Sequence, residues 1–158
     1  VQDFGNAFSS FIAQNFGAGR KDRIHAGFRG AVLVSLLFCP IISAVIWMFA
    51  RPLLLLFVNE QETAIIAEGI RYLHIEGAFY CGIGCLFLLY GLYRALGRPG
   101  MSVVLTVISL GTRVALAYIL SSIPEIGVVG IWWSVPIGWI LADAAGFVYF
   151  IRRRRLLL

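Results

Sequence analysis

The residues best suited to chemistry in this sequence share one face of the apolar segment 72–93. Steps of four, three, four, three and four residues place them on one narrow stripe of a helix, at about 100° per residue. A carboxylate beside aromatic rings suits a cavity for a lipophilic cation, because aromatic faces attract cations. The alternative is that the stripe packs against a neighbouring helix. The stripe consists of Glu76, Tyr80, Ile83, Phe87, Tyr90 and Arg94. The candidate cavity residues are four of these, Glu76, Tyr80, Phe87 and Tyr90, together with Gln14 and Trp139 from other segments.

Two further ionisable side chains, Arg113 and Asp143, also fall inside apolar segments. Such groups usually face the interior of a helix bundle or a wet cavity. Counted by helical rise, Arg113 lies about 12 Å, Glu76 about 6 Å and Asp143 about 24 Å below the outer surface. We therefore predict a structural ion pair between Arg113 and Glu76, with direct contact to a substrate as the alternative for Arg113. Asp143 is expected within reach of Thr106 or Arg94.

The cysteines do not indicate a metal site or catalysis. Cys81 and Cys85 are four residues apart and would share a helical face, but a metal site needs more ligands than their neighbourhood offers. Together with Cys39 they are better explained as small buried packing groups. The sequence contains no phosphate-binding loop, so it supports no ATPase site. We expect no cofactor, no metal and no enzymatic activity.

The elements that must position these residues are long apolar segments. The chain is 60% hydrophobic with a mean hydropathy of +0.89, far above a soluble domain. A membrane-spanning helix needs about 20 apolar residues. One segment is shorter and carries polar residues, among them Gln2, Asn6 and Ser9. The predicted class is an all-α membrane protein, a polytopic helix bundle with spans at about 1–17, 30–50, 72–93, 101–121 and 127–150.

Basic residues mark alternate gaps between these segments. Ten of the thirteen Lys and Arg residues lie in three gaps, which alternate with gaps that are acidic or nearly uncharged. Short loops rich in Lys and Arg stay in the cytoplasm. This pattern predicts the order in, out, in, out, in, with a cytoplasmic C-terminus, and it explains the net charge of +5 without nucleic-acid binding. The ten are Arg20, Lys21, Arg23 and Arg29, then Arg94 and Arg98, then Arg152, Arg153, Arg154 and Arg155.

Several motifs, in register along the whole chain, resemble the multidrug and toxic compound extrusion (MATE) family. They are 13–20 with 22–24, similar to the cytoplasmic end of that family's helix eight; 92–99, similar to the turn after helix ten; and 113–117, 127–132 and 136–139, similar to helices eleven and twelve. The resemblance identifies a family motif at the first cytoplasmic loop, made of Gln14, Asn15, Gly17, Gly19, Arg20 and Arg23.

The resemblance implies a twelve-helix transporter of two six-helix bundles, which rock about a central cavity to give alternating access. Residues 1–158 would be a partial C-terminal lobe, from the end of helix eight through helix twelve, with the N-terminal bundle absent from this chain. The polar residues of 1–17 are expected of a cavity-lining helix. Some sodium-coupled members carry an acidic residue midway along helix ten, where this chain has Ile83 and Gly84. We therefore expect the coupling carboxylate, for Na⁺ or H⁺, in the N-terminal bundle.

The function implied by the resemblance is secondary multidrug efflux. Small organic cations or drugs would leave as Na⁺ or H⁺ enters, across a plasma membrane that is expected to be a bacterial inner membrane. The expected partners are the lipid bilayer and the N-terminal bundle of the same protein. One alternative is a lipid-linked oligosaccharide flippase or polysaccharide exporter, whose cavity would need several cationic groups. A second is a membrane scaffold without transport, which would have no use for polar intramembrane stripes.

Overall fold

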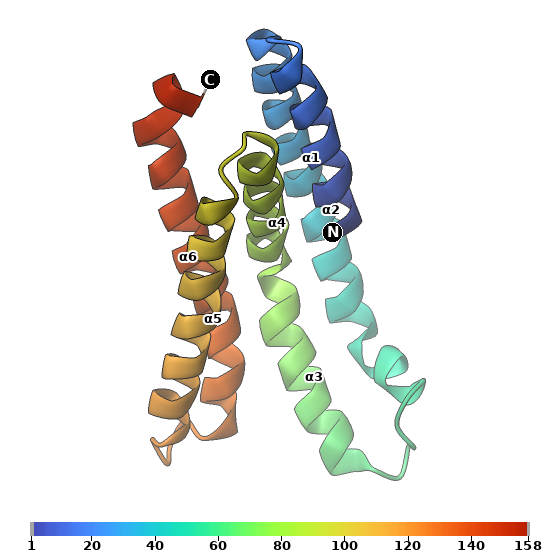
Figure 1. Cartoon of the computed structure of the whole chain (residues 1–158). Coiled ribbons are helices and arrows are strands. Elements are labelled where there is room, and N and C mark those ends of the chain that lie inside the picture. The colour runs from blue at the N-terminus through green and yellow to red at the C-terminus, as the bar shows by residue number, and fades with distance from the viewer. Residues whose placement is uncertain (1, 158) are drawn as a thin grey trace.

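The computed structural model describes residues 2–157, and side chains through Arg153. This part of the chain is helical without strands, which confirms the predicted all-α class (Figure 1). Val1, Leu158 and the side chains of Arg154 and Arg155, which belong to the predicted basic tail, lie outside the described residues. The helices are α1 (Gln2–Gly17), α2 (Lys21–Leu55), α3 (Thr63–Ala78), α4 (Tyr80–Ala95), α5 (Pro99–Ser121) and α6 (Val128–Leu157).

Three of these helices, α2, α5 and α6, are long and apolar enough to cross a membrane, and α3 with α4 can form a fourth, broken span. The chain is therefore a multi-pass membrane protein. α1 coincides with the predicted segment 1–17, but its 16 residues rise only about 24 Å, less than the ~30 Å hydrocarbon core. The outer surfaces of α2 and α5 are suited to contact with lipid or with other helices, since only 11% of the apolar stretch of each helix is buried.

α2 extends well beyond the predicted span 30–50 at both ends. Its 35 residues include an irregular position at Phe49, with φ −109° and ψ 17°. Pro52 explains this kink, because its ring lacks an N–H and clashes with the carbonyl one turn earlier. Pro40 also lies within α2, and the helix continues through it.

The predicted span 72–93 is not one straight helix. The chain is helical from Thr63, turns by 51° at Phe79 and continues as α4. Phe79 leaves helical geometry (φ −111°, ψ 18°), and its amide donates to Glu76 O at 3.1 Å, a tighter turn than the α-helix makes. The prediction of one continuous stripe across this point is therefore wrong, because the two helices do not share an axis.

Glycine ends α1 and α4 in the same way. Gly19 and Gly97 have φ of 67° and 68°, a left-handed conformation that costs glycine little. In each case the next amide bonds back to the carbonyl five residues earlier, Arg20 to Asn15 at 2.9 Å and Arg98 to Tyr93 at 2.8 Å. Pro99 then begins α5, a position where the missing N–H costs nothing.

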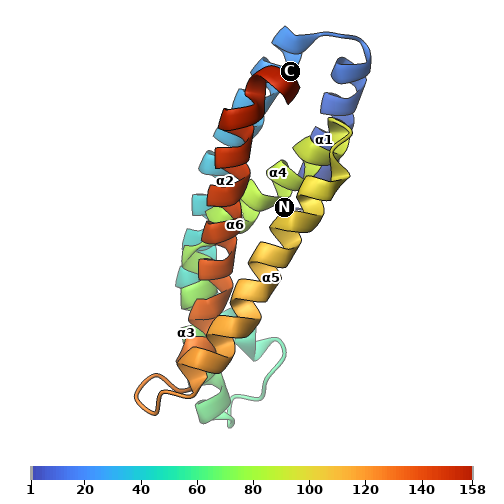
Figure 2. The ribbon, with the colours of Figure 1, turned by 60° about the vertical axis from the view of Figure 1, so that its left-hand side comes forward.

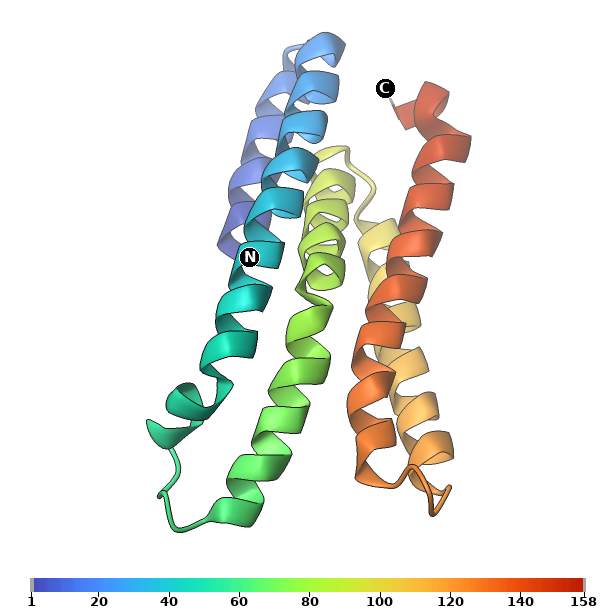
Figure 3. The same cartoon turned by 180° about the vertical axis from the view of Figure 1, so that it is seen from behind.

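α4 occupies the middle of the bundle. Figures 1 and 3 show α3 and α4 between the α1–α2 pair and the α5–α6 pair. Leu89, Leu92 and Tyr93 on α4 are fully buried, and the Tyr93 hydroxyl donates to Gly146 O on α6 at 2.6 Å. Figure 2 shows α5 and α6 diverging from their shared turn, with α5 leaning toward α1 and α6 toward α2. Phe28 of α2 accordingly stacks on Phe150 of α6, with ring centroids 5.2 Å apart.

The three basic parts of the chain lie at one end of the bundle. Figure 1 places the α1–α2 turn, the α4–α5 turn and the C-terminus toward the same end, and the α2–α3 and α5–α6 loops toward the other. Arg20, Lys21 and Arg98 are exposed at the first end, and Glu60 and Glu125 at the second. This arrangement is the one that the alternating charge pattern predicts.

Candidate functional site

The predicted cavity residues lie in separate places. Phe87 and Tyr90 share a cleft with the end of α4, whereas Glu76 and Tyr80 lie on opposite sides of the break at Phe79. Trp139 is 4% exposed and packs inside the bundle. Gln14 is exposed, about 12 Å along α1 beyond Asn6. Glu76, on α3 beyond the bend at Phe79, is not among the residues that line the cleft with Phe87 and Tyr90.

The cleft that Phe87 and Tyr90 share lies between α1, α4 and α5, and has a volume of about 230 Å³. We call it the polar cleft. α1 approaches α4 closely here, because Gly5 and Gly91 face each other: a Cβ on Gly91 would lie 2.7 Å from Gly5 O. The residues lining the polar cleft are Gln2, Asn6, Phe87, Tyr90, Arg94, Ser102 and Thr106.

Hydrogen bonds hold the side chains of the polar cleft in place. Arg94 Nη2 donates to Asn6 Oδ1 at 3.1 Å and so joins α4 to α1. Ser102 Oγ donates to the Tyr90 carbonyl at 3.3 Å, which joins α5 to α4. The Thr106 hydroxyl lies 3.3 Å from the Tyr90 hydroxyl and 3.0 Å from the Ser102 carbonyl. These contacts leave amide and hydroxyl groups at the wall of the polar cleft.

The polar cleft is suited to a molecule with an aromatic body and hydrogen-bonding groups. The Phe87 and Tyr90 rings meet edge to face, with centroids 6.1 Å apart. Such rings offer contact area and attract cations at their faces. The charged side chain among the lining residues is that of Arg94, and the lining includes no carboxylate. A cationic substrate would therefore need its counter-charge from outside this cleft.

The predicted ion pair between Arg113 and Glu76 is not formed. In the described part of the chain, ion pairs within 4.0 Å join Arg51 to Glu60 and Arg71 to Glu68, all exposed. The Arg113 guanidinium instead lies over the Trp139 ring, with Cζ 5.9 Å from the ring centroid. A count of helical rise gives depth along each helix but not which faces the helices turn toward each other, so a similar depth did not imply contact between Arg113 and Glu76.

Asp143 also lacks the partners that the sequence suggested. Arg94 bonds to Asn6 and Tyr90, and Thr106 bonds to Tyr90 and Ser102, so neither neutralises the carboxylate. Asp143 is 9% exposed, and its Oδ1 makes no hydrogen bond to any described residue.

The family motif at the first loop forms the end of α1. Asn15 is buried and its side-chain amide donates to Phe11 O at 2.8 Å, while its own carbonyl accepts from Arg20 N. Gly19 supplies the left-handed turn, and Arg20 and Arg23 are exposed. These residues set the geometry of the turn between α1 and α2.

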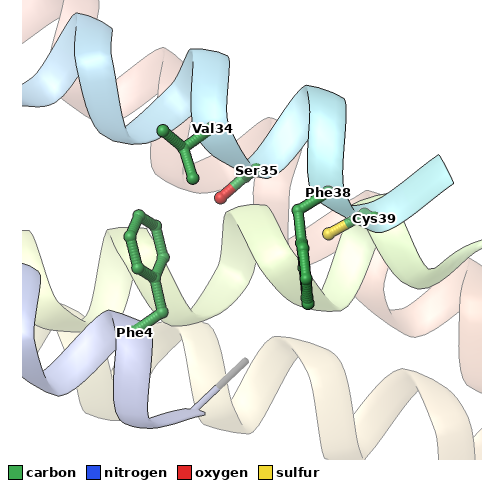
Figure 4. Close-up of a pocket in the computed structure, with 5 residues that line it drawn as sticks. All are labelled: Phe4, Val34, Ser35, Phe38 and Cys39. Carbon is green, nitrogen blue, oxygen red and sulfur yellow. The ribbon is translucent and has the colours of Figure 1, made fainter. Parts of the chain in front are cut away.

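A second, apolar groove separates the start of α1 from α2. Its volume is about 260 Å³, and it is lined by Phe4, Val34, Ser35, Phe38 and Cys39. Figure 4 shows the Phe4 ring of α1 facing α2, with Phe38 pointing down beside it. Cys39 belongs to this groove, and the described residues contain no group of three or more His, Cys, Asp or Glu side chains that could hold a metal.

Four residues that line the polar cleft, Gln2, Asn6, Ser102 and Thr106, were not predicted as cavity residues. Two features of the sequence point to them: the polar side chains spread along the segment 1–17, and the hydroxyl groups of Ser102 and Thr106, which are four residues apart and would share a helical face. Their meeting on one cleft depends on α1 and α5 packing against the same side of α4, which neither segment encodes alone.

The fold and the polar cleft together define a multi-pass, all-α membrane protein whose helices enclose a polar space. A model of the MatE family matches residues 2–119. The chain therefore belongs to the MATE family, as its motifs suggested.

Three relatives from two bacteria carry related names. The "Probable multidrug resistance protein NorM" of Rhizobium meliloti (strain 1021) is 30% identical over 156 residues, which cover 96% of this chain and 32% of the relative. Two proteins of Bacillus subtilis (strain 168) are also similar. "Probable multidrug resistance protein YpnP" is 30% identical over 92% of this chain and 32% of its own length. "Probable multidrug resistance protein YoeA" is 29% identical over 84% and 28%.

The chain spans about a third of the length of these curated relatives, between 28% and 32%. No solved structure matches it.

Proposed function

We propose that this chain is the C-terminal part of a secondary multidrug efflux antiporter, which exports lipophilic or cationic compounds in exchange for Na⁺ or H⁺. The relatives' names, which call them probable multidrug resistance proteins, support this class. The observation that carries the proposal is the polar cleft, where aromatic rings and hydrogen-bonding groups from α1, α4 and α5 line one space. Aromatic rings with a few convergent polar groups are typical of sites that bind small organic molecules.

The rest of the proposal concerns the whole protein. An N-terminal bundle would pack against these helices, supply the carboxylate that binds the coupling ion and close the other side of the substrate path. Rigid-body rocking of the two bundles would give alternating access. Because the basic turns and the C-terminus lie at one end, we propose that this end is cytoplasmic, in a plasma membrane and in bacteria the inner one.

The test is dye export by the full-length protein in a drug-sensitive bacterial strain. Phe87→Ala and Tyr90→Ala should weaken export of aromatic cations, because each removes a ring from the polar cleft. A lost cation–π contact of about 0.5–2 kcal/mol corresponds to a roughly two- to thirtyfold change in apparent affinity. Phe16→Ala is the matched control, since Phe16 on α1 is 44% exposed and lies outside the cleft lining.

Membrane expression of each variant is measured by fluorescence of a C-terminal fusion, so that loss of protein is separated from loss of transport. Unchanged export of every dye by both cleft variants would remove the polar cleft from the substrate path. If the wild-type protein exports no dye but flips a lipid-linked oligosaccharide, the second candidate of the same superfamily replaces the first. Arg94 is the one cationic residue among the lining, which favours the drug exporter over that candidate.

A further inference from the structure

Asp143 is a carboxylate that the polar cleft does not use. It lies on α6, one turn after Trp139, and among the Asp and Glu residues of the described side chains it is the one that is buried. Its position is close to the first turn of α4: a Cβ on Gly82 would lie 3.9 Å from Asp143 Oδ2 and 3.4 Å from Trp139 Cβ. The carboxyl of Asp143 therefore lies beside the backbone of α4 at Gly82.

No described group neutralises or hydrogen-bonds the free oxygen. Among the described side chains, Oδ1 has no hydrogen-bond partner, and no Lys or Arg nitrogen lies within 4.0 Å of the carboxylate. Three helices pack on α6: α4 presents Cys85 within electrostatic range, α5 carries Arg113, whose guanidinium lies over the Trp139 ring, and α3 carries Glu76. A thiol and a second carboxyl cannot supply positive charge, and Arg113 leaves its own buried Nε unpaired.

A bare carboxylate in this position would be costly. Removing an ionised group from water without a counter-charge disfavours the charged form, so such groups take up a proton or a cation. A metal cation would need several oxygen ligands in place of its water shell, as in filters built from carbonyl rings. Among the described residues no group of three or more His, Cys, Asp or Glu side chains that could hold a metal is present, and a proton needs only the one carboxyl group.

We propose that Asp143 is a proton-binding site of the C-terminal helices. The carboxyl group carries a proton in the packed arrangement of this structure, and it loses that proton to water when the rocking of the two bundles lets water reach it. The O–H bond of the acid breaks, a hydronium ion leaves, and the carboxylate remains in the opened, hydrated space. Release of the proton rests on the proposed function, because it requires the helices to move during transport. Binding of the proton in the packed structure does not.

Infrared difference spectroscopy of the full-length protein at neutral pH tests directly whether Asp143 is protonated. The spectrum of the wild type minus that of Asp143→Asn should contain the C=O stretching band of a protonated carboxylic acid, shifted when H₂O is replaced by D₂O. Asp3→Asn is the matched control: Asp3 is exposed on α1, so its removal should leave the acid band unchanged. Asp143→Glu keeps the acid and should move the band rather than remove it, which preserves the test if the Asn variant does not accumulate.

Three results would overturn the proposal. A wild-type minus Asp143→Asn spectrum without an acid band would show that the carboxylate is ionised. An unshifted band in the spectrum of Asp143→Glu would show that the band belongs to another carboxylic acid. An acid band that appears only when Na⁺ is replaced by choline would make sodium the ligand in place of the proton.

A second measurement addresses release of the proton. In proteoliposomes, an inward-directed proton gradient (acidic outside) should accelerate dye efflux by the wild type. The same gradient should accelerate dye efflux by Asp143→Asn at least fivefold less. Equal acceleration would contradict release during transport. A wild type that transports nothing would count against the proposed function, whereas the infrared result would still decide whether Asp143 holds a proton.

Discussion

Replacing Gly138 with Ala tests how closely α5 and α6 must pack. A Cβ on Gly138 would lie 2.6 Å from the backbone carbonyl oxygen of Ser109, whereas ordinary contact begins at 3.4 Å. The two helices would have to separate locally by about 0.8 Å, the difference between these distances, and a gap of that size loses a quarter to a half of the dispersion energy of the facing atoms. A backbone oxygen cannot rotate away as a side chain can. We expect the loss of about 1–3 kcal/mol that overpacking causes.

The assay is thermal unfolding of the full-length protein in detergent, with Gly111→Ala as the matched control. Gly111 lies on α5, and no atom lies within 4 Å of the Cβ that Ala would add. Ala favours a helix over Gly, so this control should be neutral or more stable by up to about 1 kcal/mol. Gly138→Ala should melt clearly below the wild type. Equal melting temperatures for the two variants would refute the close packing of α5 against α6.

Two further predictions concern topology and charge. In a variant without native cysteines, Cys at Lys21 or Arg98 should be protected from impermeant thiol reagents in intact cells and Cys at Gln61 should react; labelling at Lys21 from outside would reverse the assignment. Because Glu76 and Arg113 form no ion pair, the stability losses of Glu76→Gln and Arg113→Gln should add within about 0.5 kcal/mol in a double-mutant cycle. A double variant more stable than either single one would show that the pair forms in the full-length protein.

Much of the fold follows from local sequence. The ends of α1 and α4 are encoded by Gly19 and Gly97, and the start of α5 by Pro99, because each residue meets a backbone requirement of its own. The apolar segments predict α2, α5 and α6, since length and hydropathy suffice to identify a span. The bounds of α2 were less predictable: its first turns are polar yet helical from Lys21.

The break at Phe79 could not be predicted from the same signals. Segment 72–93 contains no proline, and its neighbours Gly77 and Gly82 are tolerated in membrane helices. The bend accompanies packing by different partners on its two sides: Gly77 of α3 lies against Ile46 of α2, and Gly82 of α4 against Trp139 of α6. These are contacts between distant parts of the chain, which a periodicity argument does not include.

The candidate site could be predicted only in part, because it too depends on contacts between distant parts of the chain. Phe87 and Tyr90 do line a polar space, and a helical period was enough to place them on one face of α4. Glu76 was assigned to that face because both halves were treated as one helix. The choice of Asn6 as the partner of Arg94 depends on which helices pack together, and the two residues are 88 positions apart.

The two halves of the broken span also affect how the chain enters the bilayer during synthesis. α3 and α4 have 16 residues each and rise about 24 Å, so neither alone crosses a hydrocarbon core of ~30 Å. A nascent chain that ends at Ala78 therefore holds α3 without a stable transmembrane position. Insertion of α3 has to wait until the ribosome has delivered α4, which makes this broken span a single unit of biogenesis although it is two helices in the folded protein.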